Sequence, residues 1–190
     1  ATFDLYTVRG YTARELWQMG REEMGGGPGG GGGEPAPLGL IAFLTPSTFK
    51  GDFGGSTLAD SLCESFKPPI ASGKSFKAFV FDSSRSALSA VLQASTTYYQ
   101  PDGQTPWFST DGFLQFTSID TPLSGAPKFW TGLVNGNPGI GDACQNWSDS
   151  TILYNGYTWD AAAIETSSFT TGTPETCDSD RSLLCIEQLP

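Results

Sequence analysis

The chain has 190 residues, of which 38% are hydrophobic and 13% aromatic, so one domain with an appendage can bury a substantial core. Twenty acidic residues against 10 basic residues give a net charge of −10, which opposes binding to nucleic acid or to anionic lipid. No run of 18 apolar residues occurs, so we expect no membrane insertion.

The cysteines indicate the compartment. Four Cys in an even number, without any His and with abundant Ser, Thr and Gly, predict an oxidising, extracellular or cell-surface setting. Four buried free thiols in a cytosolic protein are the alternative. A tetrahedral zinc site is disfavoured because the cysteines form no Cys-x-x-Cys pair. The first residues lack the basic and apolar regions of a signal peptide, so we expect the sequence of a mature chain.

In chain order, the first predicted unit is a strand-helix arm over residues 1–24. Residues 2–8 alternate in polarity, which predicts a strand that ends at Gly10. Thr12 can then cap a helix that runs to Met24. The apolar side chains expected to make the contacts of the arm are Phe3, Leu5, Leu16 and Trp17.

A Gly/Pro-rich linker follows over residues 25–37, and its stretch GGGPGGGGG offers no side chain that can pack. One strand and one helix have no second layer to bury against, so the arm must dock on something else. It can pack on its own domain, or it can add a strand or helix to a neighbouring copy. A tether is superfluous for an arm that packs where it started, which favours self-association through residues 1–24.

The predicted domain covers residues 38–190 and is α+β. Residues 38–46 predict a buried strand, 54–66 a helix, 74–82 a strand covered on both sides, and 84–95 a second short helix. The first helix is expected to have Ser56 as its N-cap and an inner face of Leu58, Leu62, Cys63 and Phe66. Further short strands are expected near 113–119, 128–134 and 182–188, with loops between them.

The order of the cysteine motifs resembles a known superfamily. STLADSLCESF carries Cys63, FWTGLVNGNPGIGDACQNW carries Cys144, and Cys177 precedes LLCIEQ with Cys185. Over residues 38–188 this order resembles the C-type-lectin-like superfamily and its endostatin-like branch, including bacterial surface domains. The resemblance implies short antiparallel strands, two helices, long loops and a nested disulfide pair, Cys63–Cys185 and Cys144–Cys177. Without the resemblance, four Cys allow three pairings.

Ligand sites of that superfamily carry over poorly to this sequence. The calcium motifs of sugar-binding C-type lectins are missing, and zinc and heparin sites like those of the endostatin-like branch would need histidines and clustered arginines. Four oxygen-bearing residues could still chelate calcium, although Asn and Asp beside Gly and Pro are ordinary turn residues. They are Asn135, Asn137, Asp142 and Glu175. We therefore expect no cofactor, with calcium as the alternative.

Catalysis is also disfavoured. The chain has no His to act as the base for a nucleophilic Ser or Cys. Asp178 paired with Asp180 or Glu187 could in principle hydrolyse glycosides, but such residues are more typical of a loop between cystines. We predict that the protein is not an enzyme.

Aromatic residues of the loop-rich half are the remaining source of binding chemistry. They are Trp107, Trp130, Trp147, Tyr154, Tyr157 and Trp159. The resemblance places Trp130 and Trp147 in the core and leaves Tyr154, Tyr157 and Trp159 as ligand candidates. The sequence thus predicts a non-enzymatic extracellular structural or adhesive subunit that self-assembles through its arm. The alternative is a monomeric glycan- or protein-binding module that uses its aromatic loops.

Overall fold

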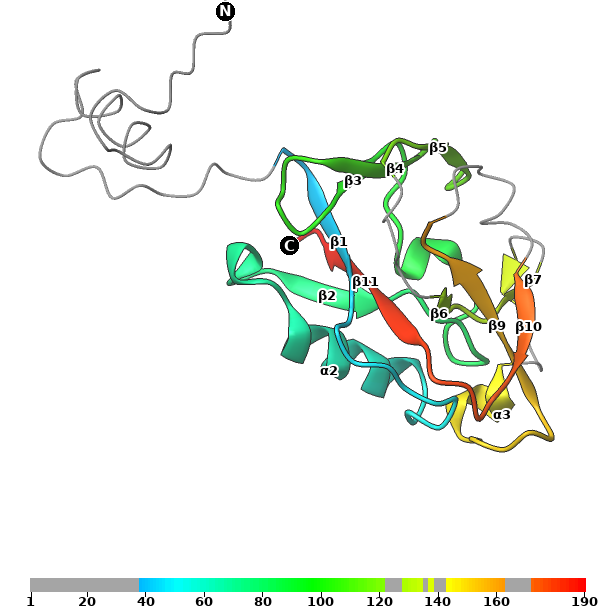
Figure 1. The fold of residues 1–190 in the computed structure, drawn as a ribbon. Coiled ribbons are helices and arrows are strands. Elements are labelled where there is room, and N and C mark those ends of the chain that lie inside the picture. The colour runs from blue at the N-terminus through cyan, green and yellow to red at the C-terminus, as the bar shows by residue number, and fades with distance from the viewer. Residues whose placement is uncertain (1–37, 122–127, 135–136, 139–142, 163–171) are drawn as a thin grey trace, which may run out of the picture. The chain divides into compact units, whose positions relative to one another are not determined.

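The computed structural model describes residues 38–121, 128–134, 137–138, 143–162 and 172–190 (Figure 1). The chain divides into Ala1–Pro35 and Ala36–Pro190, and the fold described below is that of the second unit. The predicted arm, with Phe3, Leu5, Leu16 and Trp17, and the predicted linker lie outside the described residues.

The central strand of the domain is β11 (Ser182–Gln188), whose first six residues are all buried. Such a continuous run is typical of a strand that is covered on both faces. It pairs antiparallel with β1 (Leu40–Leu44), which places Ala42 opposite Ile186. Both strands are confirmed at the positions that their apolar runs predict.

Within the described residues, nine strands form one mixed sheet in the order β10-β9-β6-β11-β1-β3-β4-β5, and β2 also pairs with β11. The other strands of this sheet are β2 (Ser75–Ala78), β3 (Thr97–Tyr99), β4 (Pro106–Thr110), β5 (Phe116–Ile119), β6 (Lys128–Trp130), β9 (Asn155–Asp160) and β10 (Thr173–Thr176). The short strands β7 (Leu133–Val134) and β8 (Asn137–Pro138) form a separate pair. The domain is therefore a mixed α+β structure, as predicted.

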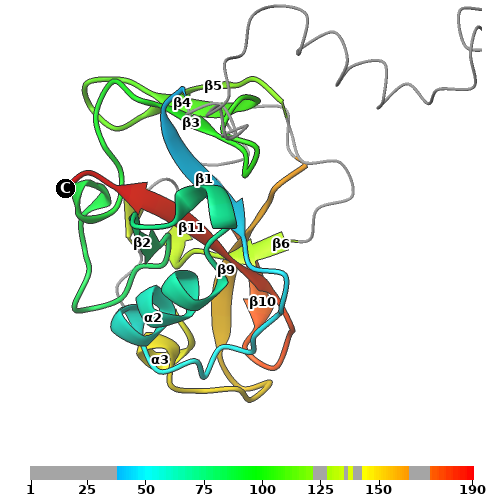
Figure 2. The same cartoon turned by 90° about the vertical axis from the view of Figure 1, so that its left-hand side faces the viewer.

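The sheet has a different apolar cluster on each face. Phe76, Ala78 and Val80 join the cluster that packs under helix α2 (Ser56–Phe66), whereas Phe79 and Phe81 join an aromatic cluster. The predicted strand covered on both sides is thus confirmed, although its ladder is confined to β2. Figure 2 shows α2 against β2 and β11, with β3, β4 and β5 farther along the sheet.

Helix α2 is confirmed, but two details of its prediction are wrong. Its N-cap is Gly55, and no side chain caps it locally. Ser56 is the first helical residue, and its N–H donates to a carboxylate oxygen of Asp82 at 2.8 Å. Leu58 is 55% exposed, and Ala59 packs in the core with Cys63 instead. The apolar spacing located the helix, but both faces of α2 carry apolar side chains.

The second predicted helix, over residues 84–95, is wrong: only the 3-10 turn Leu88–Ala90 forms there. The carboxylate of Asp82 accepts the N–H groups of Ser84 and Arg85 and holds the start of this segment as a turn. Local side-chain acceptors of this kind compete with helical hydrogen bonds.

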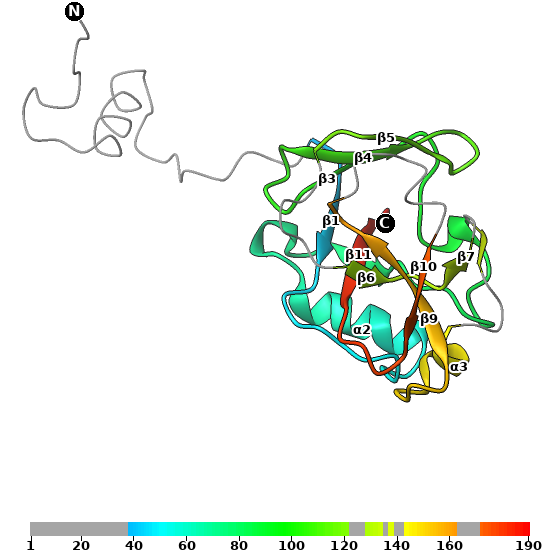
Figure 3. The same cartoon turned by 45° about the vertical axis from the view of Figure 1, so that its right-hand side comes forward.

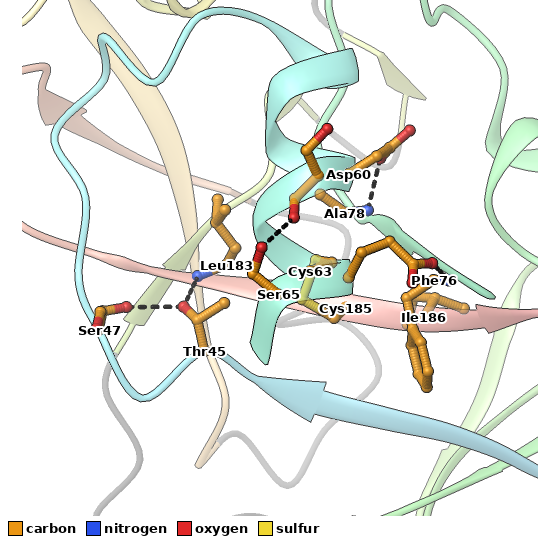
Figure 4. Close-up of a disulfide and its surroundings, with 12 residues drawn as sticks. Thr45, Ser47, Asp60, Cys63, Ser65, Phe76, Ala78, Leu183, Cys185 and Ile186 are labelled. Carbon is orange, nitrogen blue, oxygen red and sulfur yellow. Dashed lines mark hydrogen bonds between the residues drawn. A yellow bond between two sulfur atoms is a disulfide. The ribbon is translucent and has the colours of Figure 1, made fainter. Parts of the chain in front are cut away.

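Two disulfides close the domain in the nested arrangement that the resemblance implies. Cys63 of α2 is bonded to Cys185 of β11, as Figure 4 shows, and Cys144 is bonded to Cys177. Beside the first bridge, the hydroxyl of Thr45 accepts the N–H of Leu183 at 2.9 Å. Both bridges lie in the cluster under α2.

A left-handed turn, α3 (Cys144–Trp147), carries one cysteine of the second bridge. Its φ angles are 46° at Cys144, 51° at Gln145, 59° at Asn146 and 60° at Trp147. This region costs about 1–2 kcal/mol per residue for amino acids other than Gly, so tertiary contacts must hold it. The indole N–H of the buried Trp147 donates to the carbonyl of Phe81 at 3.0 Å and provides one such contact.

Candidate functional site

The buried carboxylate of Asp82 fixes the start of α2. One of its oxygens accepts from Ser56 at 2.8 Å, and the other accepts from the N–H and the hydroxyl of Ser84 at 2.8 and 2.6 Å. Burial opposes ionisation of Asp82, but the hydrogen bonds from Ser84 and Ser56 outweigh it and hold its pKa below 3.8. Asp82 therefore serves as a cap for α2 from a distant turn, in the favourable field of the helix N-terminus.

Two carboxylates of α2 cover the free edge of β2. Asp60 accepts the N–H of Ala78 at 2.8 Å, and Glu64 accepts the N–H of Phe76 at 2.5 Å. Positions i and i+4 on a helix match alternate residues of a strand closely enough for both bonds to form. Arg85 pairs with Asp60 and donates to the carbonyl of Ala78 at 2.8 Å. Helix α2 is thus fixed on the sheet by polar contacts.

The other buried acids also have structural partners. Glu187 accepts the N–H of Ile41 at 2.9 Å and the ammonium of Lys74 at 2.7 Å, so this predicted alternative for a catalytic carboxylate holds β1 beside β11. Glu175 is bound by Lys128 at 2.7 Å and by Arg181. Burial raises the pKa of Glu175, but the hydrogen bonds and charges of Lys128 and Arg181 lower it by more. The pKa of Glu175 therefore lies below its ordinary value of 4.5. The calcium ligation considered for Glu175 is disfavoured, because both its oxygens bind cationic side chains.

The aromatic ligand candidates separate into core and surface. Trp159 is only 2% exposed, so this ligand candidate is a core residue, and Trp107 is fully buried as well. Trp130 and Trp147 are buried, as the resemblance implies. Tyr157 is half-buried, and Tyr154 is exposed.

The polar ligand candidates form no site that the structure describes. Asn137 belongs to β8, and Asn135 and Asp142 lie outside the described residues. Among the residues of known placement, no group of three or more His, Cys, Asp or Glu could hold a metal ion. In the same part of the chain, no helix is both long and apolar enough to cross a membrane.

Tyr154 belongs to an exposed apolar loop that the sequence reasoning passed over. Ile152 is 70% exposed and Leu153 79% exposed, next to Tyr154 at 42%. The carboxylate of Asp149 shapes this loop by accepting the N–H and the hydroxyl of Thr151 at 2.7 and 2.6 Å. The sequence signal for this exposed loop is a run of three apolar residues between turn residues. We call Ile152, Leu153 and Tyr154 the apolar loop.

A groove lies on the outer side of α2, between the helix and the segment that leads into it. Its volume is about 400 Å³, and its lining consists of Phe49, Phe53, Leu58, Ser61, Leu62 and Ser65. The ring of Phe53 stacks on Trp147 with centroids 4.9 Å apart, which fixes one wall. We call these six residues the α2 groove. All of them are uncharged.

Backbone hydrogen bonds connect the apolar loop to the segment that forms one wall of the α2 groove. The N–H of Gly51 donates to the carbonyl of Cys177 at 2.8 Å, and Cys177 donates in turn to the carbonyl of Tyr154 at 3.0 Å. Gly54 donates to the carbonyl of Trp147 at 2.8 Å. In Figures 1 and 3, α2 and α3 lie at one end of the domain, and β3, β4 and β5 lie at the other. We call the loop and the groove together the apolar end.

A glycine permits the close packing beneath this end. A Cβ on Gly51 would lie 2.3 Å from the Sγ atom of Cys144 and 2.9 Å from the carbonyl oxygen of Asp149. A side chain at this position would therefore push the groove segment away from the second disulfide. The surface is consequently a fixed one, built on a cross-linked support.

These observations define an α+β domain with two disulfides and an uncharged apolar end. The chain belongs to the family described as "Protein of unknown function (DUF1554)", whose model matches residues 46–164. That range contains both the α2 groove and the apolar loop. No curated protein matches the sequence.

Proposed function

We propose that this protein is a non-enzymatic extracellular subunit with a structural or adhesive role, which self-assembles through residues 1–24 and presents a C-type-lectin-like domain. The observation that carries the structural or adhesive role is the apolar end. The chain carries a net charge of −10, yet its domain leaves Leu58, Ile152 and Leu153 more than half exposed, which is a surface suited to protein contacts. Such surfaces mark interaction sites more often than sites of chemistry.

The use of the ionisable groups supports a non-catalytic role. Asp82, Glu187 and Glu175 each accept at least two hydrogen bonds from neighbouring groups of the fold. A carboxylate that serves as general acid or base needs a free oxygen directed at substrate. The chain also has no His, the commonest catalytic base.

The disulfides support the extracellular setting. Cystines persist in oxidising compartments and are rare where thiols are kept reduced. The nested pairing and the cysteine in the central strand β11 also support the resemblance to the endostatin-like branch. The two disulfides hold α2 on β11 and Cys144 on Cys177, beneath the apolar loop.

Assembly through the arm can be tested by measuring the molar mass of the non-reduced protein in solution. Light scattering on the full chain and on a chain that starts at Glu34 should show the larger assemblies only for the full chain. As a matched control, Leu5→Ser, Leu16→Ser and Trp17→Ser together keep the length of the arm and remove its apolar contacts. Equal masses for the full and shortened chains would refute self-assembly through residues 1–24.

A second candidate function is binding of a protein or glycan ligand at the apolar loop. Tyr154 favours it, because this ring is exposed beside two exposed aliphatic side chains. A screen against immobilised glycans and surface proteins with Tyr154→Ala as the control should then show loss of binding. Equal retention of the wild-type protein and this variant would exclude Tyr154 as the binding residue.

A further inference from the structure

We propose that the apolar end is an interface between two copies of this chain, in which the apolar loop of each copy occupies the α2 groove of the other. The inference rests on the proposed function as a self-assembling subunit. It adds a contact made by the domain itself, separate from residues 1–24. Because the same surface serves both partners, the contact has two-fold symmetry.

The apolar end is complementary to itself. A two-fold interface requires a projection and a hollow on one face, so that each copy supplies both. The apolar loop projects, with Leu153 79% exposed and Ile152 70% exposed. The α2 groove is hollow, and its volume of about 400 Å³ can take two aliphatic side chains. Cys177 links the two parts, because its carbonyl accepts from Gly51 beside the groove and its N–H donates to the carbonyl of Tyr154 in the loop, so they are neighbours at the same end of the domain.

The charge of the chain favours contact at this uncharged end. Two chains that each carry a net charge of −10 repel one another, and the core of a protein interface is depleted of charged residues. The six residues of the α2 groove are uncharged, and so are the five from Ser150 to Tyr154. Two copies can therefore meet at this end without burying a charge. Lys50 and Asp52 are exposed on the segment beside the groove and supply a polar rim of both signs.

The apolar loop and the α2 groove are both held in place by contacts within the domain. The apolar loop is held by the hydrogen bonds of Asp149 to Thr151 and by the bond from Cys177 to Tyr154. The Cys144–Cys177 disulfide lies directly beneath, and Phe53 is stacked on Trp147. A surface fixed in this way loses little conformational entropy on association, which leaves more of the apolar burial to stabilise the complex.

Sedimentation analysis of the full chain over a range of concentrations tests this interface. Leu153→Glu and Leu58→Glu each place a charge in both copies of the contact and should weaken the dimer at least about 100-fold. The matched control is Phe113→Glu, because Phe113 is 86% exposed in the turn between β4 and β5, at the other end of the domain. This control should leave the dissociation constant unchanged. Equal association of wild type and Leu153→Glu would overturn the proposal, and the exposure of Leu153 makes this variant safe for folding.

Mixing complementary variants tests the geometry. A copy with Leu153→Glu and a copy with Leu58→Lys should each be impaired alone. Together they form a mixed dimer in which one loop-groove contact is native and the other joins Glu to Lys. Recovery of most of the lost affinity on mixing, within about tenfold of wild type, is expected. Absence of any recovery would overturn the loop-in-groove arrangement.

The chain that starts at Glu34 separates this inference from the proposed function. It keeps both apolar clusters and both disulfides, all of which lie within the compact unit Ala36–Pro190. A dimer of this chain that Leu153→Glu dissociates supports the inference. A monomer, with assembly only of the full chain, overturns the inference and leaves the arm as the assembly device. Monomers in both cases overturn both proposals, and a monomer that binds another surface protein through Leu153 assigns the apolar end to that partner instead.

Discussion

The two faces of the central sheet are covered by different means. Under α2, the apolar cluster contains all four cysteines of the chain, paired as two disulfides. The cluster on the other face contains no cysteine and is rich in aromatic rings, among them Tyr98, Trp107, Phe108, Phe129 and Trp159. One face therefore adds two cross-links to an apolar cluster that includes Phe43, Phe76, Trp130 and Trp147, whereas the other relies on buried ring area without cross-links.

This difference matters because the two means act on different states. A disulfide restricts the unfolded chain, whereas aromatic packing stabilises the folded one. Phe79 illustrates the second case, with ring centroids 5.1 Å from Phe81 and 5.4 Å from Trp159. The face with the cross-links is also the one that supports the apolar end. How far the two faces are independent can be measured by weakening each one separately.

The largest effect is expected from removing a disulfide. The Cys63–Cys185 bridge spans 122 residues, so replacing both cysteines by Ala should cost about 5 kcal/mol of unfolding free energy. The Cys144–Cys177 bridge spans 33 residues, and its removal should cost about 4 kcal/mol. Denaturant unfolding of the two double variants measures both losses. A larger loss at the shorter bridge would contradict the chain-entropy account.

On the aromatic face, truncation of Phe79 should cost nearly as much. Phe79 is fully buried among other rings, so Phe79→Ala should lower the free energy of unfolding by about 3–5 kcal/mol. Phe79→Leu keeps most of the apolar volume and serves as the control with a smaller loss. If the faces are independent, the loss should be the same with the disulfides intact or reduced. A clear difference between these conditions would show that the faces are coupled.

Removing the polar attachment of α2 at Asp82 should have a smaller effect. Asp82→Ala leaves the N–H groups of Ser56 and Ser84 without their acceptor and should cost about 2–3 kcal/mol, unlike Asp52→Ala at an exposed site. The pKa of Asp82 lies below 3.8, so its ionised form stabilises the fold above that pH, and this stabilisation is lost as pH falls through the folded pKa. Acid titration of stability should therefore be shallower in Asp82→Ala. An unchanged dependence of stability on acid pH would show that ionised Asp82 does not stabilise the fold.

The smallest effect is a gain. Gln145 is exposed and has φ 51°, so Gln145→Gly removes the left-handed penalty at the expense of a more flexible unfolded chain. The net stabilisation should be about 0.5–1 kcal/mol, visible as a higher melting temperature. Ser61→Gly in the right-handed helix α2 is the matched control and should be destabilising. A loss at Gln145 equal to that at Ser61 would mean that no relief occurs.

Local patterns predicted the parts of the fold in which sequence and burial agree. The runs that became β1 and β11 are apolar along their length, and the helix around Cys63 has its apolar spacing. The prediction of a helix over 84–95 failed because Asp82, a residue outside the helical pattern, accepts hydrogen bonds from the first N–H groups of the segment. The same carboxylate replaced the expected cap at Ser56. In the first case the competing acceptor lies only two or three residues away, whereas in the second the bond joins residues 26 positions apart along the chain.

The candidate site was less accessible to sequence reasoning. An aromatic residue in a loop-rich region can lie inside or outside, and Trp159 lies in β9 with its ring in the core, whereas Tyr154 is exposed. The apolar spacing predicts Leu58 on the inner face of the helix, yet Leu58 lines the α2 groove. A groove forms only where two segments meet. The local sequence of residues 49–53 and that of α2 do not indicate that these two segments lie side by side. The cysteines were the exception, because a family resemblance supplied their pairing.

The carboxylates of Asp60 and Glu64 have a consequence for aggregation. They bind the N–H groups along the outer side of β2, which would otherwise be open to a strand from another molecule. Unpaired edges of this kind are the usual starting points of fibrils and of strand exchange. In the described part of the sheet, a strand from outside could then join only at its two terminal strands, β5 and β10. By occupying the middle edge with a helix, the protein confines any growth of its sheet to the two ends.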